Sequence, residues 1–379
     1  MSYVFSFGLI AIVALCFMTC FFRFHKRLVT LLPMLLKQIS KQSIDELRSV
    51  SIGGLQQWLH IRGCNTDNPI LLVLHGGPGA SHIGWFDEIQ RPWENHFTVV
   101  QWDQRQAGKS YAPIKQVSAS MNNAQMISDA KKVVAYLREQ FQHEKIFIMG
   151  TSYGTYLGMH LVKSQPKSFY AYVAIGQVVN MMEHASKEHE KLLDYAKESG
   201  DTLLARKLSD ISPFPDPDNK SASFLANVGF IIDQQSLLGK CFPMSLSDLG
   251  KIIAIKKMIS PLYSWRDRIN LLFGDKPALH CAKCPFAEDF MGYNLPVEVG
   301  SELEAPIFFF TGIDDWHVSS EMTDQWFQRI QSPFKEQVWF KQSAHAPYLT
   351  EPYAFAKALV EKVHPFSQGD ILARGQINE

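Results

Sequence analysis

Short, continuous runs of apolar residues alternate along this chain with segments of helical periodicity. The runs ILLVLH (70–75), FTVVQWD (97–103), IFIMG (146–150) and FYAYVAI (169–175) have the length of strands, and such continuous apolar runs indicate burial on both faces. Between them, residues 122–141 place apolar side chains at helical spacing. This order of strand, helix and strand predicts an α/β fold with a mostly parallel central sheet and helices on both faces.

The strand pattern is interrupted by a long helix-rich segment. Residues 56–62 alternate like an antiparallel strand, residues 178–298 are irregular and rich in helical patterns, and the run APIFFFTG (305–312) resumes the strand pattern. We therefore predict a core formed by residues 49–177 and 299–366, with residues 178–298 inserted as a helical cap over the site.

The N-terminus carries a separate signal. Residues 1–22 contain no charged side chain, and a helix of that length spans about 33 Å, enough to cross a bilayer. Arg23, Lys26 and Arg27 follow, which favours the cytoplasmic side for the rest of the chain. The sequence predicts a single-pass membrane protein with a basic linker (23–48), a cytoplasmic catalytic domain and membrane lipid as a partner. A cleaved signal peptide and a buried helix are the alternatives.

Composition excludes some classes of partner and cofactor. The chain carries 37 basic and 37 acidic residues, so it has no basic excess to neutralise nucleic-acid phosphates. Cys281 and Cys284 form a C-x-x-C pair, but no second pair completes a zinc site. We expect no metal, no organic cofactor and no nucleic-acid partner.

A lone serine stands at a sharp corner between a strand and a helix. Ser152 follows the apolar run that ends at Gly150, and the helical pattern starts at Tyr153. Gly150, Ser152 and Gly154 have the G-x-S-x-G spacing of a nucleophile elbow, where glycines give the tight turn its freedom. The sequence therefore predicts that Ser152 is a nucleophile.

Such a serine needs a base and an acid that orients the base. In folds of this kind the chain order is serine, acid, histidine. Asp314 and Asp315 follow the run APIFFF, and His345 follows the strand-like run QVWF. The order and the positions past strand ends predict His345 as the base and one of the two aspartates as the acid.

A tetrahedral intermediate also needs donors for its oxyanion. The backbone N–H after the nucleophile, that of Tyr153, is one predicted donor. The loop that follows the run ILLVL is His75–Gly79, HGGPG, whose glycines allow close approach of the main chain. We predict Gly77 as the second donor.

These motifs together resemble a known family. HGGPG (75–79), the run DQRQAGKS (103–110) and the elbow are similar to the prolyl iminopeptidase family of α/β-hydrolases. The resemblance implies the α/β-hydrolase fold. The family's Gly-x-x-Asp pattern matches Gly312 to Asp315, so the resemblance implies Asp315 as the acid and His345 as the base, with Asp314 as the reserve choice.

Two features depart from the family's pattern. The usual glycine after Asp-Gln-Arg is Gln106 here. The family's iminopeptidases hold the substrate's amino group with cap glutamates, one of which follows a tryptophan, whereas Trp93-Glu94 precedes the predicted cap. Glu288 and Asp289 are the acids of the cap that could serve instead.

The sequence thus predicts a serine hydrolase that acts through an acyl-enzyme. The favoured function is an aminopeptidase of prolyl iminopeptidase type that releases N-terminal residues from short peptides. The first alternative is an esterase or amidase on small or lipid-derived acyl substrates. The alternative of another class is a catalytically silent hydrolase fold used for binding.

Overall fold

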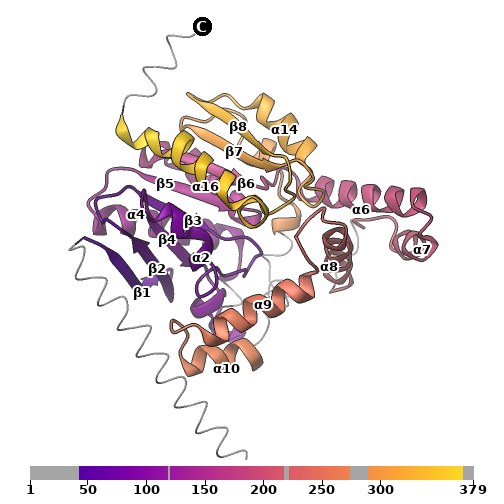
Figure 1. Cartoon of the computed structure of the whole chain (residues 1–379), viewed down its shortest axis with the longest axis horizontal. Helices are drawn as coiled ribbons and strands as arrows, with labels where there is room; N and C mark the ends of the chain where they lie inside the picture. Colours follow the sequence, from indigo (N-terminus) through magenta and orange to yellow (C-terminus); the bar gives the residue numbers. More distant parts are fainter. Residues whose placement is uncertain (1–41, 118–119, 217–221, 274–288, 370–379) are drawn as a thin grey trace, which may run out of the picture. The chain divides into compact units, whose positions relative to one another are not determined.

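The computed structural model describes residues 42–117, 120–216, 222–273 and 289–369, and the chain from Ile44 onward forms one compact unit (Figure 1). The strands are β1 (Ile44–Ile52), β2 (Leu55–Gly63), β3 (Ile70–Leu74), β4 (Thr98–Asp103), β5 (Ile146–Thr151), β6 (Phe169–Ile175), β7 (Ile307–Gly312) and β8 (Lys335–Phe340). The α-helices of the described residues are α2 (Asp87–Gln90), α3 (Ile114–Val117), α4 (Asn123–Gln140), α5 (Tyr153–Ser164), α6 (Met181–Glu198), α7 (Thr202–Asp210), α8 (Ala222–Leu237), α9 (Leu246–Ile259), α10 (Trp265–Phe273), α13 (Leu295–Glu298), α14 (Ser320–Arg329), α15 (Pro347–Thr350) and α16 (Pro352–Ala358).

The strands form an eight-stranded sheet in the order β1-β2-β4-β3-β5-β6-β7-β8. β1 pairs antiparallel with β2 and β2 with β4, whereas all pairs from β4 to β8 are parallel. The predicted mostly parallel sheet is confirmed, and so is the antiparallel strand at residues 56–62. β1 begins at Ile44, inside the segment predicted as the basic linker (23–48), so that linker prediction extends too far.

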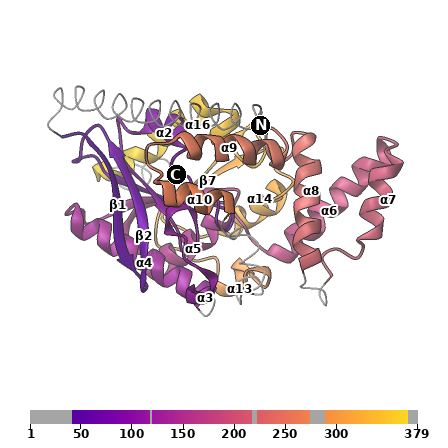
Figure 2. The same ribbon diagram turned by 90° about the horizontal axis from the view of Figure 1, so that it is seen from below.

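Helices cover both faces of the sheet because its inner strands are apolar on both faces. Leu72 and Leu74 of β3 share a hydrophobic cluster with side chains of α4, α5 and α14. Leu71 and Val73 point the other way, into a second cluster with side chains of α16 and of the segment around α2. Figure 2 shows α4 and α5 on one side of the sheet and α2 and α16 on the other.

The chain leaves the sheet after β6 and returns to it at β7. Helices α6 to α10 and α13 lie in this insertion, at the position of the predicted cap (178–298). α6, α7 and α8 share a small hydrophobic cluster of their own, which includes Leu192, Leu208 and Ile231. Figure 1 shows α6 and α7 extending away from the sheet and α9 and α10 lying on another side of the cap. We keep the name cap for residues 178–298, whose limits stay a prediction.

The prediction of a transmembrane helix is wrong for the fold that the structure describes. Across the described ranges, no helix combines the length and the apolar character that crossing a bilayer requires. Such a helix needs about 20 mainly apolar residues, whereas α4 and α6, at 18 residues each, carry several charged side chains. The fold class is corrected to an α/β fold in which no described helix spans a membrane. The predicted single-pass membrane localisation and lipid partner are withdrawn with it.

Some predicted segments lie outside the described residues. These are residues 1–22, on which the anchor was predicted, and the pair Cys281 and Cys284.

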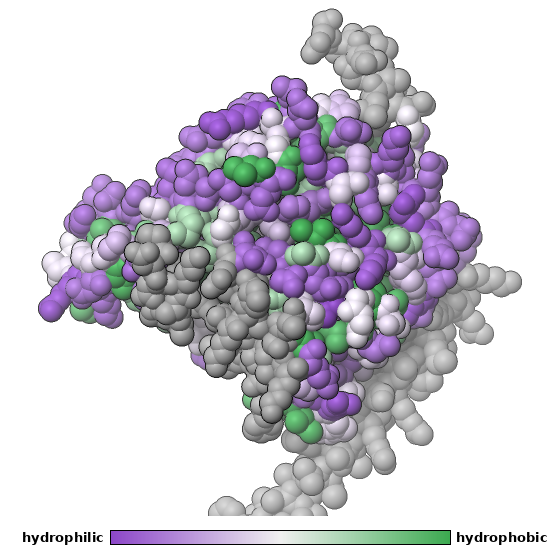
Figure 3. Space-filling view, turned by 180° about the vertical axis from the view of Figure 1, so that it is seen from behind, coloured by the Kyte–Doolittle hydropathy of each residue, from purple (hydrophilic) through white to green (hydrophobic). Residues whose placement is uncertain are grey.

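On the surface that is described, the face in Figure 3 is mainly hydrophilic, with hydrophobic residues in small separate patches.

Candidate active site

Ser152 lies at the corner between β5 and α5. Its backbone dihedrals are φ 50° and ψ −120°, a conformation that few non-glycine residues adopt, and its N–H donates to Ile175 O at 2.8 Å. A Cβ at Gly150 would lie 2.6 Å from Gly154 O, and a Cβ at Gly154 would collide with Leu74 O. Both glycines of the motif are therefore required by packing at this turn.

The loops after β7 and β8 bring Asp315 and His345 together. His345 Nδ1 lies 2.8 Å from Asp315 Oδ2, and Asp315 Oδ1 accepts a hydrogen bond from the Val318 N–H at 2.9 Å. Both side chains are buried. Asp314, the reserve choice, instead forms an ion pair with Lys240 at 2.8 Å and is about half exposed.

The HGGPG loop lies beside the serine. A Cβ at Gly76 would lie 3.1 Å from Ser152 Cβ, and Gly77 has a φ of 113°, which favours glycine. Tyr153 is the first residue of α5, where backbone N–H groups point out of the helix terminus. Tyr153 thus follows Ser152 directly, and Gly77 follows Gly76 and lines the same pocket as Ser152. Their role as oxyanion donors stays a prediction.

The two motifs that carry the family resemblance contact each other. His75 is buried, and its Nδ1–H donates to Gly76 O at 2.8 Å while its Nε2 accepts from the Gln104 N–H at 3.3 Å. Gln104 Nε2 also donates to His75 O at 2.9 Å. Burial lowers the pKa of His75 to about 4, so its ring stays neutral and keeps these two bonds. The Asp-Gln-Arg segment thus fixes the start of the HGGPG loop.

Gln106 occupies the position of the family's glycine. Its φ is 66°, in the left-handed region that favours glycine. The side chain offsets this cost with two hydrogen bonds to Ala112, one donated to its carbonyl at 2.8 Å and one accepted from its N–H at 2.9 Å. The departure from the family's pattern therefore leaves the turn intact.

A pocket of about 590 Å³ at this site is lined by residues of both the core and the cap. Ser152, His345 and Gly77 line its core side. The cap contributes a mainly apolar wall, which includes Ile232, Leu246, Leu249, Ile253, Phe290 and Met291. The described residues that line the pocket include no aspartate and no glutamate.

Sequence reasoning missed a buried pair next to His345. His317 Nδ1 lies 2.7 Å from Glu188 Oε2, and the ring centroids of His317 and His345 are 5.0 Å apart. Burial alone would lower the pKa of His317, but the Glu188 carboxylate more than offsets it, so the pKa is raised. His317 follows Asp315 in the same loop, which is a signal that could have been found. Glu188 stands in no motif of α6, and only the fold brings it here.

Two of the three acids considered for a substrate amino group are described, and neither lines this pocket. Glu94 is buried beside Arg62, at 3.3 Å from its Nη2, and accepts from Gln90. Asp289 Oδ2 accepts from the Asn123 N–H at 3.3 Å. Glu288 lies outside the described residues. Neither of the two described acids lines the pocket.

Comparisons with known proteins agree with the fold. The family described as alpha/beta hydrolase fold matches residues 69–206. The chain is 31% identical over 326 residues to the probable aminopeptidase YbaC of Bacillus subtilis, and this alignment covers 84% of this chain and 96% of that protein. It is 29% identical over 145 residues to the proline iminopeptidase of Lactobacillus delbrueckii subsp. lactis, covering 38% of this chain and 47% of that protein.

Solved structures show the same fold at low identity. The proline iminopeptidase-related protein of Thermus thermophilus superposes with a TM-score of 0.56 at 16% identity, covering 84% of this chain and 99% of that one. The proline iminopeptidase of Mycobacterium smegmatis gives a TM-score of 0.53 at 17% identity, covering 85% and 99%. The fold and the site define an enzyme of the α/β-hydrolase class. Within that class, the chain belongs to the prolyl iminopeptidase family, as its sequence motifs indicated.

Proposed function

We propose that this hydrolase uses Ser152 as its nucleophile. The observation that carries the proposal is the 2.8 Å contact between His345 Nδ1 and Asp315 Oδ2 in the pocket that Ser152 also lines. An Nδ1–H held by a carboxylate leaves the other ring nitrogen, Nε2, free to act as a base. His345 accepts the serine proton through Nε2, and Asp315 fixes the orientation of its ring.

The reaction proceeds in two halves. In the first, Ser152 Oγ forms a bond to the substrate's carbonyl carbon, and His345 passes the proton to the leaving group as the old bond breaks. In the second, His345 takes a proton from water as the water oxygen attacks the acyl carbon, and it returns this proton to Ser152 Oγ as the ester bond breaks and the acid is released. The amides of Gly77 and Tyr153 stabilise the oxyanion in both halves, and losing one such donor costs about 2.7–4 kcal/mol.

The favoured substrate is the N-terminal residue of a short peptide. The support is the likeness over most of the chain to a protein named a probable aminopeptidase, together with shorter likenesses to proline iminopeptidases. The second candidate is hydrolysis of acyl esters or amides, which the apolar cap wall of the pocket favours.

A substrate panel tests this choice. Aminoacyl 4-nitroanilides of proline, leucine and alanine are compared with 4-nitrophenyl esters of short and long fatty acids, with kcat/KM as the readout. We expect at least one aminoacyl anilide to be cleaved with a kcat/KM above about 10⁴ M⁻¹s⁻¹, the lower end of the ordinary range for enzymes. Turnover of the esters alone would contradict the aminopeptidase assignment and favour the esterase.

The packing of the loops after β7 and β8 gives a separate prediction. A Cβ at Gly312 would collide with Ala344 O. Ala344 directly precedes His345, and Gly312 lies three residues before Asp315. We expect Gly312→Ala to lower kcat/KM by about 10²-fold and the free energy of unfolding by about 1–3 kcal/mol. Enzyme kinetics and thermal unfolding measure both effects.

A glycine in open surroundings is the matched control. Gly229 lies in α8, and a Cβ added there meets no heavy atom within 4 Å. Gly229→Ala should leave the kinetics unchanged and raise stability by about 0.5–1 kcal/mol, because alanine is the better helix former. Wild-type kinetics in Gly312→Ala would show that the close approach of the two loops is not needed.

A further inference from the structure

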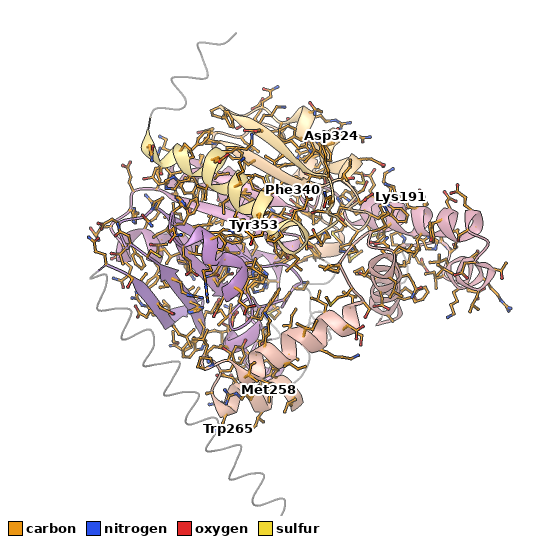
Figure 4. The ribbon with its side chains drawn as sticks, in the orientation of Figure 1. Lys191, Met258, Trp265, Asp324, Phe340 and Tyr353 are labelled. Carbon is orange, nitrogen blue, oxygen red and sulfur yellow. The ribbon has the colours of Figure 1, made fainter. Side chains whose placement is uncertain are left out.

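One face of helix α9 lines the pocket. Leu246, Leu249, Gly250, Ile253 and Lys257 follow one another at the spacing of a single helical face, and all five line the pocket. The last of them is a lysine at a position where this pattern calls for an apolar side chain. Figure 4 labels the next residue, Met258, near the end of α9, and Trp265 at the start of α10.

The lysine is buried in the pocket wall. Lys257 is only 6% exposed, and burial is costly for an ammonium group that has no partner. Within the described ranges, Lys257 Nζ takes part in no hydrogen bond or ion pair, and it lies 6.0 Å from the centroid of the Tyr263 ring, a weak cation–π contact that leaves its hydrogen-bond donors unused. A buried cation in the wall of a pocket that has no carboxylate of its own among the described lining residues calls for an anion from outside.

The competing role for this lysine is that of a counter-ion for Asp103. Asp103 is buried at the end of β4, and its Oδ2 already accepts from the Lys109 N–H at 2.8 Å. Its charge acts on Lys257, but no ion pair found among the described residues joins the two. A structural counter-ion and a substrate-binding cation give different kinetics, so an experiment can separate them.

We propose that Lys257 is the anion-binding residue of the pocket and that the preferred substrates carry a carboxylate. In a short peptide this is the free C-terminal carboxylate. The proposal rests on hydrolysis at Ser152, and it deepens that function by naming a substrate class: peptides short enough for their C-terminus to enter the pocket.

Two matched pairs of substrates test the proposal in the full-length protein. The first pair is a dipeptide and the same dipeptide with a C-terminal amide. The second is the 4-nitrophenyl monoester of adipic acid and its methyl ester, which differ in charge but need no peptidase activity. We expect the carboxylate form of each substrate that is turned over to have about a 10-fold or greater advantage in kcat/KM, mainly through KM.

Neutral variants of two neighbouring lysines show which one is responsible. Lys257→Met keeps the length of the side chain and should bring the ratio of carboxylate to neutral substrate to about one, because the carboxylate substrate loses more kcat/KM than the neutral one. Lys256→Met is the control, because Lys256 is partly exposed and pairs with Glu88 at 2.6 Å. It should keep the wild-type ratio. A wild-type ratio near one, or an unchanged ratio in Lys257→Met, would overturn the proposal.

The two substrate pairs separate this proposal from the proposed function. If only the ester pair is turned over and its ratio depends on Lys257, the peptidase assignment fails and the anion site stands. If the dipeptides are cleaved without a preference for the free carboxylate, the anion site fails and the peptidase stands.

A pH profile of the wild-type protein gives a second readout if Lys257→Met does not fold. Burial lowers the pKa of Lys257 to about 8, partly offset by Asp103, so the ammonium is lost as the pH rises through 8. Four buried titratable groups lie near Lys257. Burial lowers the pKa of His75 to about 4 and that of His82 well below its usual value, so both rings are neutral. Burial raises the pKa of Asp103 to about 6 and that of Tyr263 well above its usual value.

None of these four neighbours changes charge between pH 7 and 9. In the wild type, the ester-pair ratio should therefore fall toward one across this interval, because Lys257 loses its charge. His317 also lines the pocket, and Glu188 raises its pKa against the effect of burial. The ester-pair ratio should still fall with pH in His317→Gln. A ratio that stays flat from pH 7 to 9.5 would overturn the proposal.

Discussion

Replacing Ser152 with alanine is expected to lower kcat by about 10⁶-fold, the loss known for removal of the serine from a comparable triad. This corresponds to about 8 kcal/mol of transition-state stabilisation. The fold should persist, because the hydrogen bonds at this corner come from the backbone: Ser152 N–H to Ile175 O at 2.8 Å and Thr155 N–H to Ser152 O at 2.8 Å. Steady-state kinetics and thermal unfolding measure the two effects.

Ser152→Gly is the companion variant. It removes the hydroxyl and also relieves the positive φ of 50°, a conformation that costs a non-glycine residue about 1–3 kcal/mol. We expect the same loss of activity with unchanged or raised stability, which separates the chemical role of the serine from its place in the fold. Near-normal turnover in either variant would remove Ser152 from the mechanism.

The second large effect is expected at Asp315. Asp315→Asn keeps the shape of the side chain but allows the His345 ring to adopt the wrong tautomer, so kcat should fall by about 10⁴-fold. The matched control is Asp314→Asn. Asp314 is half exposed and pairs with Lys240 at 2.8 Å, an arrangement whose loss costs about 0–1 kcal/mol of stability and no activity. A larger loss of activity at Asp314 would reverse the assignment of the acid.

The strands of the core could be predicted because each carries its own local signal. β3, β5 and β7 are continuous apolar runs, and the structure buries every residue in them. The elbow, HGGPG and Gly-x-x-Asp motifs are equally local, since each places small residues at a tight turn directly after a strand. A sequence pattern is therefore enough to find Ser152 and the loops that surround it.

The cap side of the site has no such signal. Glu188 of α6 lies 129 positions before its partner His317, which follows Asp315 in the loop after β7, and Lys257 is one of several lysines in α9. Their proximity to the pocket follows from the packing of an inserted segment onto the core, which periodicity does not encode. The anchor prediction rested on the length of one apolar run alone, and no helix of the described residues has the length and apolar character to cross a bilayer.

The central claim is that Ser152 carries the acyl group, and covalent labelling tests it most directly. The protein is treated with a serine-reactive fluorophosphonate, digested, and analysed by mass spectrometry of its peptides, with Ser152→Ala as the control. We predict one labelled peptide, the one that contains Ser152, with labelling lost in the variant and prevented by excess of the best substrate. A label on another residue, or wild-type labelling in Ser152→Ala, would contradict this account of the site.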